Sequence, residues 1–365
     1  MDLGEYQRRY FQGHEACFAC PVSCGRYTSL PRGSSGGGHF GGLHVEGVLA
    51  LGPGIGLFRW EPLLELAQAC LLAGLDPAST GGVIGWAMDC RQAGLLTSQE
   101  IGPLTLERGA GQAALELTQR IVSGQGWGDQ LGQGALRAAR ELGQEAEERV
   151  KHVKGLEMVG PDPCLAPASG LSLAISPGEW DPLKFISGLE YQPLKGRQGE
   201  PGPPYGPATD LADQVESVTR SEEERVSAES LGLCPFPNAY FQALGLPELS
   251  EQFTGLTGVG LDEARLRRIV ARILTLERLL AGRDGCGRRE DAPAERYFQE
   301  EAEGGPCQGA GLERAGWEAA LTRYYQVRGW DLPTGLPSRE AVADLDLEAA
   351  EEEAQGAIEA YQRRP

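Results

Sequence analysis

The chain has 365 residues, of which 41% are hydrophobic, so it can bury one large core or two smaller ones. Its formal net charge of −19 argues against nucleic acid as a partner, because the phosphates would be repelled. No apolar run reaches the roughly 20 residues that span a bilayer, and the first residues lack the basic and apolar regions of a secretory signal. We therefore expect a cytoplasmic protein that binds neither nucleic acid nor membrane.

Residues 1–43 predict a loop region, because the glycine-rich run at 32–38 disfavours both helix and strand. The first clear helical pattern covers Trp60 to Ala73, and Gly74 after it is a natural C-cap. Residues 76–81 predict a turn. Further helices are expected at about 109–123, 128–142, 208–229, 237–246, 248–254, 262–281 and 313–327.

No run of alternating β-branched residues is long enough to predict a sheet, so we expect a mostly α fold. Composition changes between Gly143 and Pro163, and the Pro/Gly-rich stretch at 193–207 predicts a long surface loop. The predicted domain boundary lies near residue 147. It separates two helical domains, 1–147 and 148–365, with a cofactor site at their interface.

Three of the nine cysteines are clustered, as Cys17, Cys20 and Cys24 in the spacing C-x2-C-x3-C. This spacing lets one short loop direct three thiolates at a single inorganic centre, with a fourth thiol arriving from elsewhere. The candidates are an iron–sulfur cluster and a zinc ion. A disulfide framework is the poorer interpretation for a long chain without a secretory signal.

Seven short motifs follow one another along the chain. They are A-C-F-A-C-P-V-S-C-G-R at 16–26, V-E-G-V-L-A-L-G at 45–52, G-L-D-P-A-S-T-G at 74–81, V-K-G-L-E-M at 153–158, L-G-L-C at 231–234, R-E-D at 289–291 and Y-Y-Q-V-R-G-W-D at 324–331. In this order they resemble the aldehyde ferredoxin oxidoreductases. That resemblance implies a tungsten (or molybdenum) bis-pterin and a [4Fe-4S] cluster.

The resemblance implies four cluster ligands, Cys17, Cys20, Cys24 and Cys234. A [4Fe-4S] cluster needs four thiolates, and three from one loop with one distant thiol would supply them. A zinc site built from the same cysteines stays open as an alternative, as do thiols that bind no metal.

The family holds its pterins through two D-x-x-G-L-(C/D) segments, and the resemblance implies pterin contacts at Asp76, Glu229, Gly232 and Leu233. Helix capping is the alternative role for the two carboxylates. Leu71 stands where the first segment expects an aspartate, and its side chain cannot accept a hydrogen bond. Pterin binding is therefore expected to be weakened on that side.

Glu46 falls where the family places a glutamate that faces the metal and the substrate. A desolvated carboxylate there could act as a base or hydrogen-bond partner, and its alternative role is at a helix N-terminus. The segment 161–164 lacks an arginine that the family carries there, so a charge partner in the pocket is expected to be lost.

The resemblance covers nearly the whole chain but only part of the family, since the β-rich N-terminal pterin domain would lie upstream of Met1. We expect a C-terminal fragment or split subunit of a tungsten-dependent aldehyde:ferredoxin oxidoreductase, which oxidises aldehydes to carboxylic acids and passes electrons through its cluster to ferredoxin or a similar acceptor. A separate subunit would carry the missing domain, without which the chain would be inactive. The alternative is a non-catalytic iron–sulfur electron-transfer subunit, or relict, that has lost pterin binding.

Overall fold

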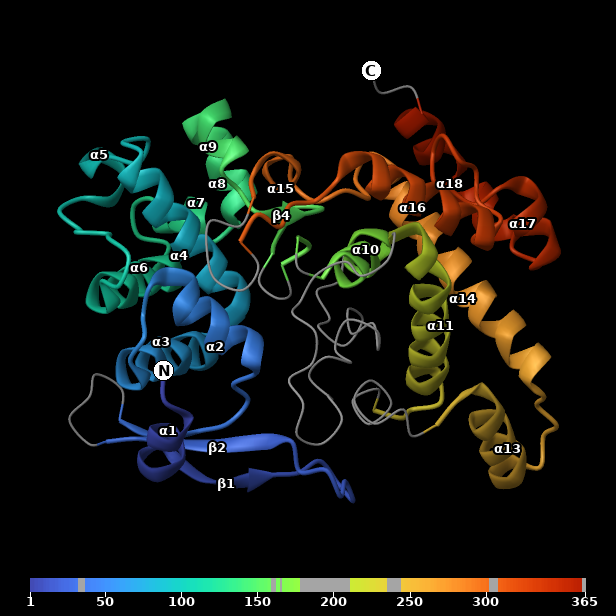
Figure 1. The fold of residues 1–365 in the computed structure, drawn as a ribbon, viewed down its shortest axis with the longest axis horizontal. Coiled ribbons are helices and arrows are strands. Elements are labelled where there is room, and N and C mark those ends of the chain that lie inside the picture. Colours follow the sequence, from blue (N-terminus) through green and yellow to red (C-terminus); the bar gives the residue numbers. More distant parts are fainter. Residues whose placement is uncertain are drawn as a thin grey trace. The chain divides into compact units, whose positions relative to one another are not determined.

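The computed structural model is mostly helical, as the sequence predicted (Figure 1). It describes residues 1–31, 37–158, 162–164, 166–177, 211–234, 244–301 and 308–362. The chain divides into two compact units, Met1–Gly160 and Pro161–Pro365. None of the described helices is both long and apolar enough to cross a membrane.

The first unit begins with a helix and a small antiparallel sheet of order β1-β2-β3, so the predicted loop at 1–43 is wrong. The elements are α1 (Leu3–Arg9), β1 (Phe11–Glu15), β2 (Gly25–Leu30) and β3 (Gly38–Phe40). Tertiary packing explains this sheet, because Tyr10, Leu30 and Phe40 are buried in the core of the unit. The Trp60 indole also donates a hydrogen bond to the Asp2 carbonyl, 2.7 Å away, and so attaches the start of the chain to the first long helix.

The remaining elements of the first unit are helices and one short hairpin. They are α2 (Val45–Leu51), the 3-10 helix η1 (Pro53–Ile55), α3 (Trp60–Ala73), α4 (Pro77–Gln92), α5 (Ser98–Ile101), α6 (Gly111–Ser123), α7 (Gly128–Leu131), α8 (Ala135–Leu142), α9 (Gln144–Glu148), β4 (His152–Val153) and β5 (Leu156–Glu157). The hairpin belongs to this unit, since β5 contacts α4 and α8. The predicted domain boundary near residue 147 stays a prediction.

Helix α3 has the predicted bounds, and Gly74 ends it in the left-handed conformation. The predicted turn at 76–81 is wrong, because Asp76 caps α4 and Pro77 occupies its first position. The glycines here serve a close helix contact: a Cβ on Gly81 would lie 2.6 Å from the Cβ of Ala50 in α2. The predicted helix at 128–142 is two helices, separated where Gly134 has a φ of +95°.

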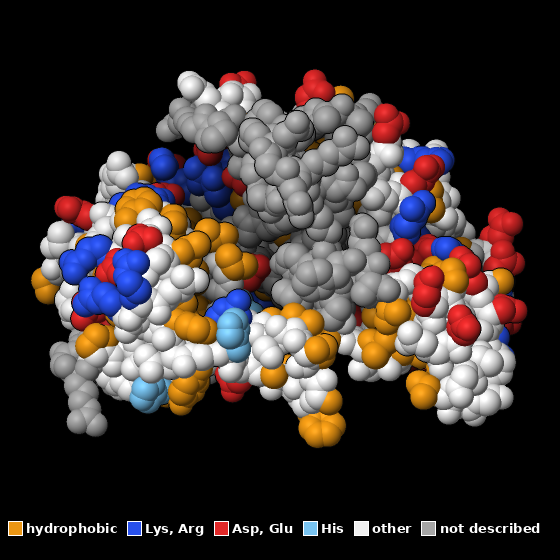
Figure 2. All heavy atoms as spheres, turned by 60° about the horizontal axis from the view of Figure 1, so that its bottom comes forward, with side chains coloured by type: hydrophobic (Ala, Val, Ile, Leu, Met, Phe, Trp, Pro, Cys, Tyr) orange, Lys and Arg blue, Asp and Glu red, His pale blue; other side chains and the backbone are white. Residues whose placement is uncertain are grey.

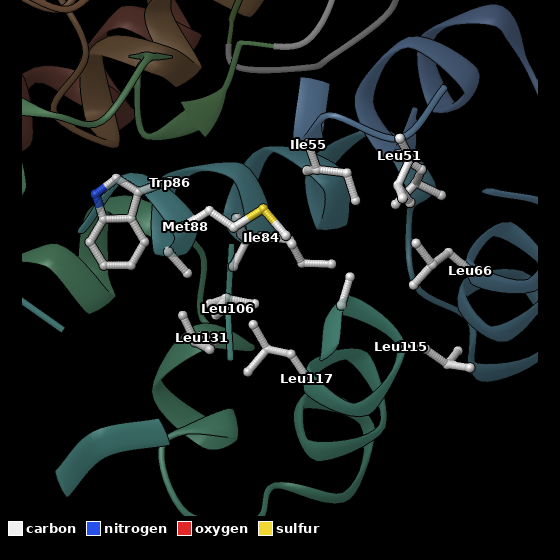
Figure 3. Packing of buried hydrophobic residues seen from close by; sticks show 14 of the residues in the cluster. Leu51, Ile55, Leu66, Ile84, Trp86, Met88, Leu106, Leu115, Leu117 and Leu131 are labelled. Atoms are coloured by element: carbon white, nitrogen blue, oxygen red, sulfur yellow. The ribbon is translucent and has the colours of Figure 1, made fainter. Parts of the chain in front are cut away.

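A single hydrophobic core holds the first unit together. Figure 3 shows side chains from α3, α4, α6 and α7 gathered in it, among them Leu66, Ile84, Leu117 and Leu131. Each is at most 1% exposed, and burying one such side chain contributes about 1.5–3 kcal/mol. This core supports the elements that carry the clustered cysteines.

The second unit is built around α11, which packs against α10, α13, α14 and α16 among the described elements. Its elements are α10 (Pro167–Ile175), α11 (Leu211–Ser230), α13 (Leu246–Thr257), α14 (Glu263–Arg283), α15 (Arg296–Gln299), α16 (Arg314–Arg328), α17 (Arg339–Asp344) and α18 (Glu348–Gln362). The helices predicted at 248–254, 262–281 and 313–327 are confirmed. The loop predicted at 193–207 and most of the helix predicted at 237–246 lie outside the described residues.

A buried polar network fixes the core of the second unit. The Arg278 guanidinium donates two hydrogen bonds to the Asp291 carboxylate, at 3.0 and 2.5 Å, and the Tyr325 hydroxyl donates a third at 2.6 Å. Burial alone would lower the pKa of Arg278, but the charge and hydrogen bonds of Asp291 raise that pKa above its ordinary value. Burial and the same carboxylate raise the pKa of Tyr325.

A second network joins α11 to α16. The Arg328 guanidinium and the Tyr324 hydroxyl both donate to the Glu222 carboxylate, at 2.5 and 2.9 Å. Towards solvent, acidic and basic side chains are interleaved on the face of this unit seen at the right of Figure 2. Pairs of this exposed kind, such as Arg268 with Asp346 at 3.0 Å, contribute only about 0–1 kcal/mol each.

Candidate metal and cofactor site

The three clustered cysteines share one loop, the connection between β1 and β2. The two strands pair in antiparallel fashion as far as Glu15 and Gly25, which holds the ends of the loop together. Within it, the amide of Cys20 donates a hydrogen bond to the carbonyl of Cys17, 3.0 Å away. One hairpin therefore carries all three thiols within a few residues of each other.

Left-handed backbone precedes two of the cysteines. Ala19 has a φ of 56° and Ser23 a φ of 49°, although neither residue is a glycine. Such conformations are uncommon for these residue types and cost about 1–3 kcal/mol each. Left-handed residues in turns direct consecutive N–H groups into a concave surface that favours anions, as around many iron–sulfur sites.

Two polar side chains brace the second half of the loop. The Arg26 guanidinium donates to the carbonyls of Cys24 and Gly25, at 2.6 and 3.2 Å. The ring of His14 lies 3.1 Å from the Ser23 carbonyl and 3.2 Å from Arg26. From the sequence we expected Arg26, the last residue of the cysteine motif, to be a structural salt-bridge partner, and we assigned no role to His14.

Replacing Gly25 by alanine is expected to destabilise this hairpin, because its Cβ would lie 2.7 Å from the Glu15 carbonyl oxygen. Relieving that overlap must separate the strands at the base of the cysteine loop, at a cost of about 1–3 kcal/mol. Urea unfolding measures the change. Gly13→Ala is the matched control in the same hairpin, since nothing lies within 4 Å of its Cβ. Equal stability of the two variants would contradict the account.

The fourth predicted thiol, Cys234, follows the end of α11 in the second unit. The Leu233 amide donates to the Ala228 carbonyl at 2.8 Å, and the Gly232 amide to the Glu229 carbonyl at 2.9 Å. Gly232 has a φ of +74°, so these bonds form a Schellman motif. Cys234 therefore leaves the helix through a fixed turn, with its side chain exposed.

Residues 71–76, the first of the two segments that resemble the family's pterin-binding motif, end α3 in the same way. The Gly74 amide donates to the Leu71 carbonyl at 3.3 Å, and the Leu75 amide to the Cys70 carbonyl at 2.9 Å. Gly74 has a φ of +72°. Both segments therefore end their helices in a Schellman motif, and Asp76 has the same position after the first helix as Cys234 has after the second.

Both predicted pterin carboxylates have partners within their own unit. Asp76 accepts a hydrogen bond from the Ser79 amide at 2.5 Å and caps α4, while Glu229 pairs with Arg225 at 2.8 Å. Leu71 is half-buried and packs against the first core. The pterin contacts stay predictions. In the first segment, the packed apolar side chain of Leu71 takes the place of the expected aspartate acceptor.

Glu46 lies in the first turn of α2, where a negative charge favours the helix dipole. Its side chain is half-buried and makes no hydrogen bond or ion pair with any residue that the structure describes. The carboxylate is therefore available to an outside partner. Its catalytic role stays a prediction.

The four thiols have the chemistry of a thiolate-bound centre, since all are free cysteines, three exposed and Cys20 half-buried. Among the described residues, no three His, Cys, Asp or Glu side chains converge as a metal-binding group. Four thiols, three of them in one loop, are the donor set that a [4Fe-4S] cluster needs.

Glu157 is a buried connector that sequence reasoning missed. It is 5% exposed, and its carboxylate accepts from the Ser79 hydroxyl at 2.5 Å and from the Ala135 amide at 2.6 Å. One side chain thus joins the starts of α4 and α8. Glu157 and Ser79 each belong to one of the seven motifs, and this membership was the signal in the sequence that could have indicated their role.

Glu157→Ala is expected to lower the free energy of unfolding by about 1–3 kcal/mol, because the buried Ala135 amide loses its acceptor. Thermal or urea unfolding measures this. The exposed Glu148, whose replacement by alanine should change stability by no more than about 0.5 kcal/mol, provides the control. Similar losses of stability in both variants would mean that the hydrogen bond between Glu157 and the Ala135 amide does not stabilise the unit.

The segment 162–164, which lacks the expected arginine, contains the buried Cys164 of the second unit. The Cys164 side chain is buried, and its thiol lies 3.6 Å from the Tyr297 carbonyl, to which it donates. The Asp162 carboxylate accepts from the Cys164 amide at 2.9 Å. Burial, followed by the charge of Asp162, raises the pKa of Tyr297 well above its ordinary value.

The fold and these motifs agree with the comparisons to known proteins. The family model for aldehyde ferredoxin oxidoreductase, domains 2 and 3, matches residues 2–347. The chain therefore belongs to the aldehyde ferredoxin oxidoreductase family, as the ordered motifs predicted. Its fold is similar to the active site complex BamBC of benzoyl coenzyme A reductase in complex with 1,5-dienoyl-CoA, with a TM-score of 0.73 and 19% identity over 96% of this chain and 55% of that one.

Two relatives in sequence are tungsten-containing aldehyde ferredoxin oxidoreductases. The protein of Pyrococcus furiosus is 28% identical and that of Thermococcus kodakarensis 27%, each over 93% of this chain and 53% of the relative. The aliphatic sulfonate oxidoreductase, WOR-like subunit, of P. furiosus is 27% identical over 95% of this chain and 52% of its own length. The chain thus spans about half the length of these relatives.

Proposed function

We propose that this chain forms the helical, cluster-binding part of a tungsten-dependent aldehyde:ferredoxin oxidoreductase. The observation that carries the proposal is the loop with three free cysteines between β1 and β2, matched by a fourth free cysteine directly after α11. Membership of the family supports it, as do the tungsten-containing relatives.

In this proposal Cys17, Cys20, Cys24 and Cys234 hold a [4Fe-4S] cluster as thiolates. Such a cluster, when bound, accepts electrons from the substrate side and passes them singly to ferredoxin or a similar acceptor. The loop contributes the left-handed turns before two of its cysteines and a guanidinium on its carbonyls. The turns and the guanidinium thereby shape the loop that carries the three thiols.

For a tungsten (or molybdenum) bis-pterin, the residues fit on one side only. Glu229, with Gly232 and Leu233, would present a carboxylate and a turn backbone to one pterin. On the other side Asp76 supplies a carboxylate, but the packed Leu71 offers no acceptor.

Glu46 is proposed to orient substrate or water and to take a proton during aldehyde oxidation. Its carboxylate is half-buried and has no described partner, and those properties suit a general base. The remaining half of the pterin pocket is proposed to come from a separate subunit or segment, since the relatives are about twice as long.

Co-purification under anaerobic conditions with a chain that carries the N-terminal pterin domain tests this function. The complex is expected to contain tungsten and to reduce viologen in the presence of an aldehyde, and Glu46→Gln should lower that rate by about 10²–10⁴-fold without loss of tungsten. A tungsten-loaded complex without aldehyde-dependent reduction would contradict the aldehyde chemistry.

Leu71 favours a second candidate function, an iron–sulfur electron-transfer subunit that no longer holds tungsten. This subunit would contain about four iron atoms per chain and no tungsten, even when purified with its partner. Tungsten at one atom per complex would exclude the second candidate. Iron without tungsten would exclude the first.

A further inference from the structure

Helix α14 in the second unit exposes a line of four aliphatic side chains. Ile269, Leu276 and Leu280 are 38%, 37% and 42% exposed, and Ile273 between them is half-buried. Successive members are four, three and four residues apart, so they form a single stripe along the helix. Single exposed aliphatic side chains need no explanation, but a stripe with this spacing is the pattern by which two helices pack along each other.

The other helices of the unit leave this stripe uncovered. The far side of α14 carries Leu274 and Arg278, both buried, and among the described elements α11, α13 and α18 pack against the helix. The stripe stays exposed with these three neighbours in place. Helix α14 therefore presents a ridge along which a further helix could lie.

Opposite charges flank the stripe on its two sides. If Ile273 and Leu280 take the a positions of a heptad, Arg272 falls at g and Glu277 at e. In a parallel pair of helices, a g residue of one helix faces the e residue five positions later in the other. Arg272 and Glu277 are five positions apart, so two copies of α14 side by side would form two equivalent ion pairs.

An antiparallel pair lacks this complementarity. There g positions face g positions, and the arginines at Arg265 and Arg272 of both copies would share one side of the contact. Arg272 also keeps donors for a partner, because only its Nη1 atom is engaged, with the Leu345 carbonyl and with Asp346. Its Nε and Nη2 atoms have no hydrogen-bond partner among the described residues.

We propose that two copies of this chain associate through α14, as a parallel helix pair about a twofold axis. The four aliphatic side chains of the stripe pack against their equivalents, and Arg272 of each copy pairs with Glu277 of the other. The stripe covers about three turns of helix, so the contact belongs to the small, weak class of interfaces. We expect a dissociation constant of about 1–100 μM.

Analytical ultracentrifugation of the full chain, purified anaerobically, tests the proposal between about 1 and 200 μM. A dimer that forms as the concentration rises is expected, and Leu276→Glu should weaken it at least about 100-fold, because the contact would bury two like charges. Val327→Glu is the matched control: Val327 is 42% exposed on α16, outside the stripe, and its variant should dimerise like the parent. Circular dichroism checks that both variants keep their helices.

Exchanging the two charges tests the parallel orientation. Arg272→Glu and Glu277→Arg should each weaken the dimer at least about fivefold, and the double variant should regain the parent affinity within about twofold. Side chains five positions apart in one helix do not face each other, so this recovery can arise only between copies. A monomer at every concentration would overturn the proposal. So would equal weakening by Leu276→Glu and Val327→Glu, or single charge variants without effect or without recovery in the double variant.

Discussion

Replacing Cys20 by serine is expected to abolish the iron–sulfur cluster that we propose for this chain. The half-buried Cys20 lies in the middle of the loop, and a hydroxyl in place of its thiolate removes one of the four soft ligands that the cluster requires. Iron content after anaerobic purification is expected to fall from about four atoms per chain to less than about one. The absorbance of the protein near 400 nm, which reports the cluster, should fall in parallel, to roughly a quarter or less.

Cys286→Ser is the matched control, because Cys286 is a half-buried cysteine outside the four proposed ligands. It should retain the full iron content. If both variants kept their iron, the loop would not hold the cluster. If both lost it to the same extent, the loss would reflect folding, and ligation by Cys20 would be refuted.

Asp291→Asn will destabilise the second unit by about 3–5 kcal/mol, because it leaves the Arg278 guanidinium buried without a counter-charge. The two side chains are 1% and 0% exposed, so water cannot replace the lost partner. The asparagine can still accept from the Tyr325 hydroxyl, and the effect therefore reports mainly the unpaired charge. Urea unfolding followed by tryptophan fluorescence measures it, since Trp317 donates to the Asp291 carbonyl.

The control for this variant is Asp284→Asn at the end of α14. Asp284 pairs with Arg283, and the two side chains are 68% and 50% exposed, so the change should cost no more than about 1 kcal/mol. A loss below about 1 kcal/mol for Asp291→Asn as well would show that the buried pair does not support the core.

Local signals explain which elements the sequence could predict. The helices α3 and α14 carry long amphipathic patterns, with Gly74 after the first and Asp262 capping the second. The start of helix α4 was missed because residues 76–81 have the composition of a turn, whereas Gly81 permits a close contact with α2. The β1–β2 hairpin was missed because its strands are short and depend on the burial of Tyr10 and Leu30.

The same distinction applies to the candidate site. The spacing of the cysteines is a local signal, and the structure bears out that one loop carries three of them. The contact of Ser79 with Glu157 joins residues 78 positions apart, and no periodicity or spacing could indicate it.

We propose that this chain holds a [4Fe-4S] cluster through Cys17, Cys20, Cys24 and Cys234. Mössbauer spectroscopy on iron-57-labelled protein, together with iron, sulfide and zinc analysis after anaerobic purification, tests it most directly. The account predicts about four iron atoms and four sulfides per chain, with the spectrum of a [4Fe-4S] centre. One zinc ion per chain with neither iron nor sulfide would contradict it and leave a zinc-stabilised helical module.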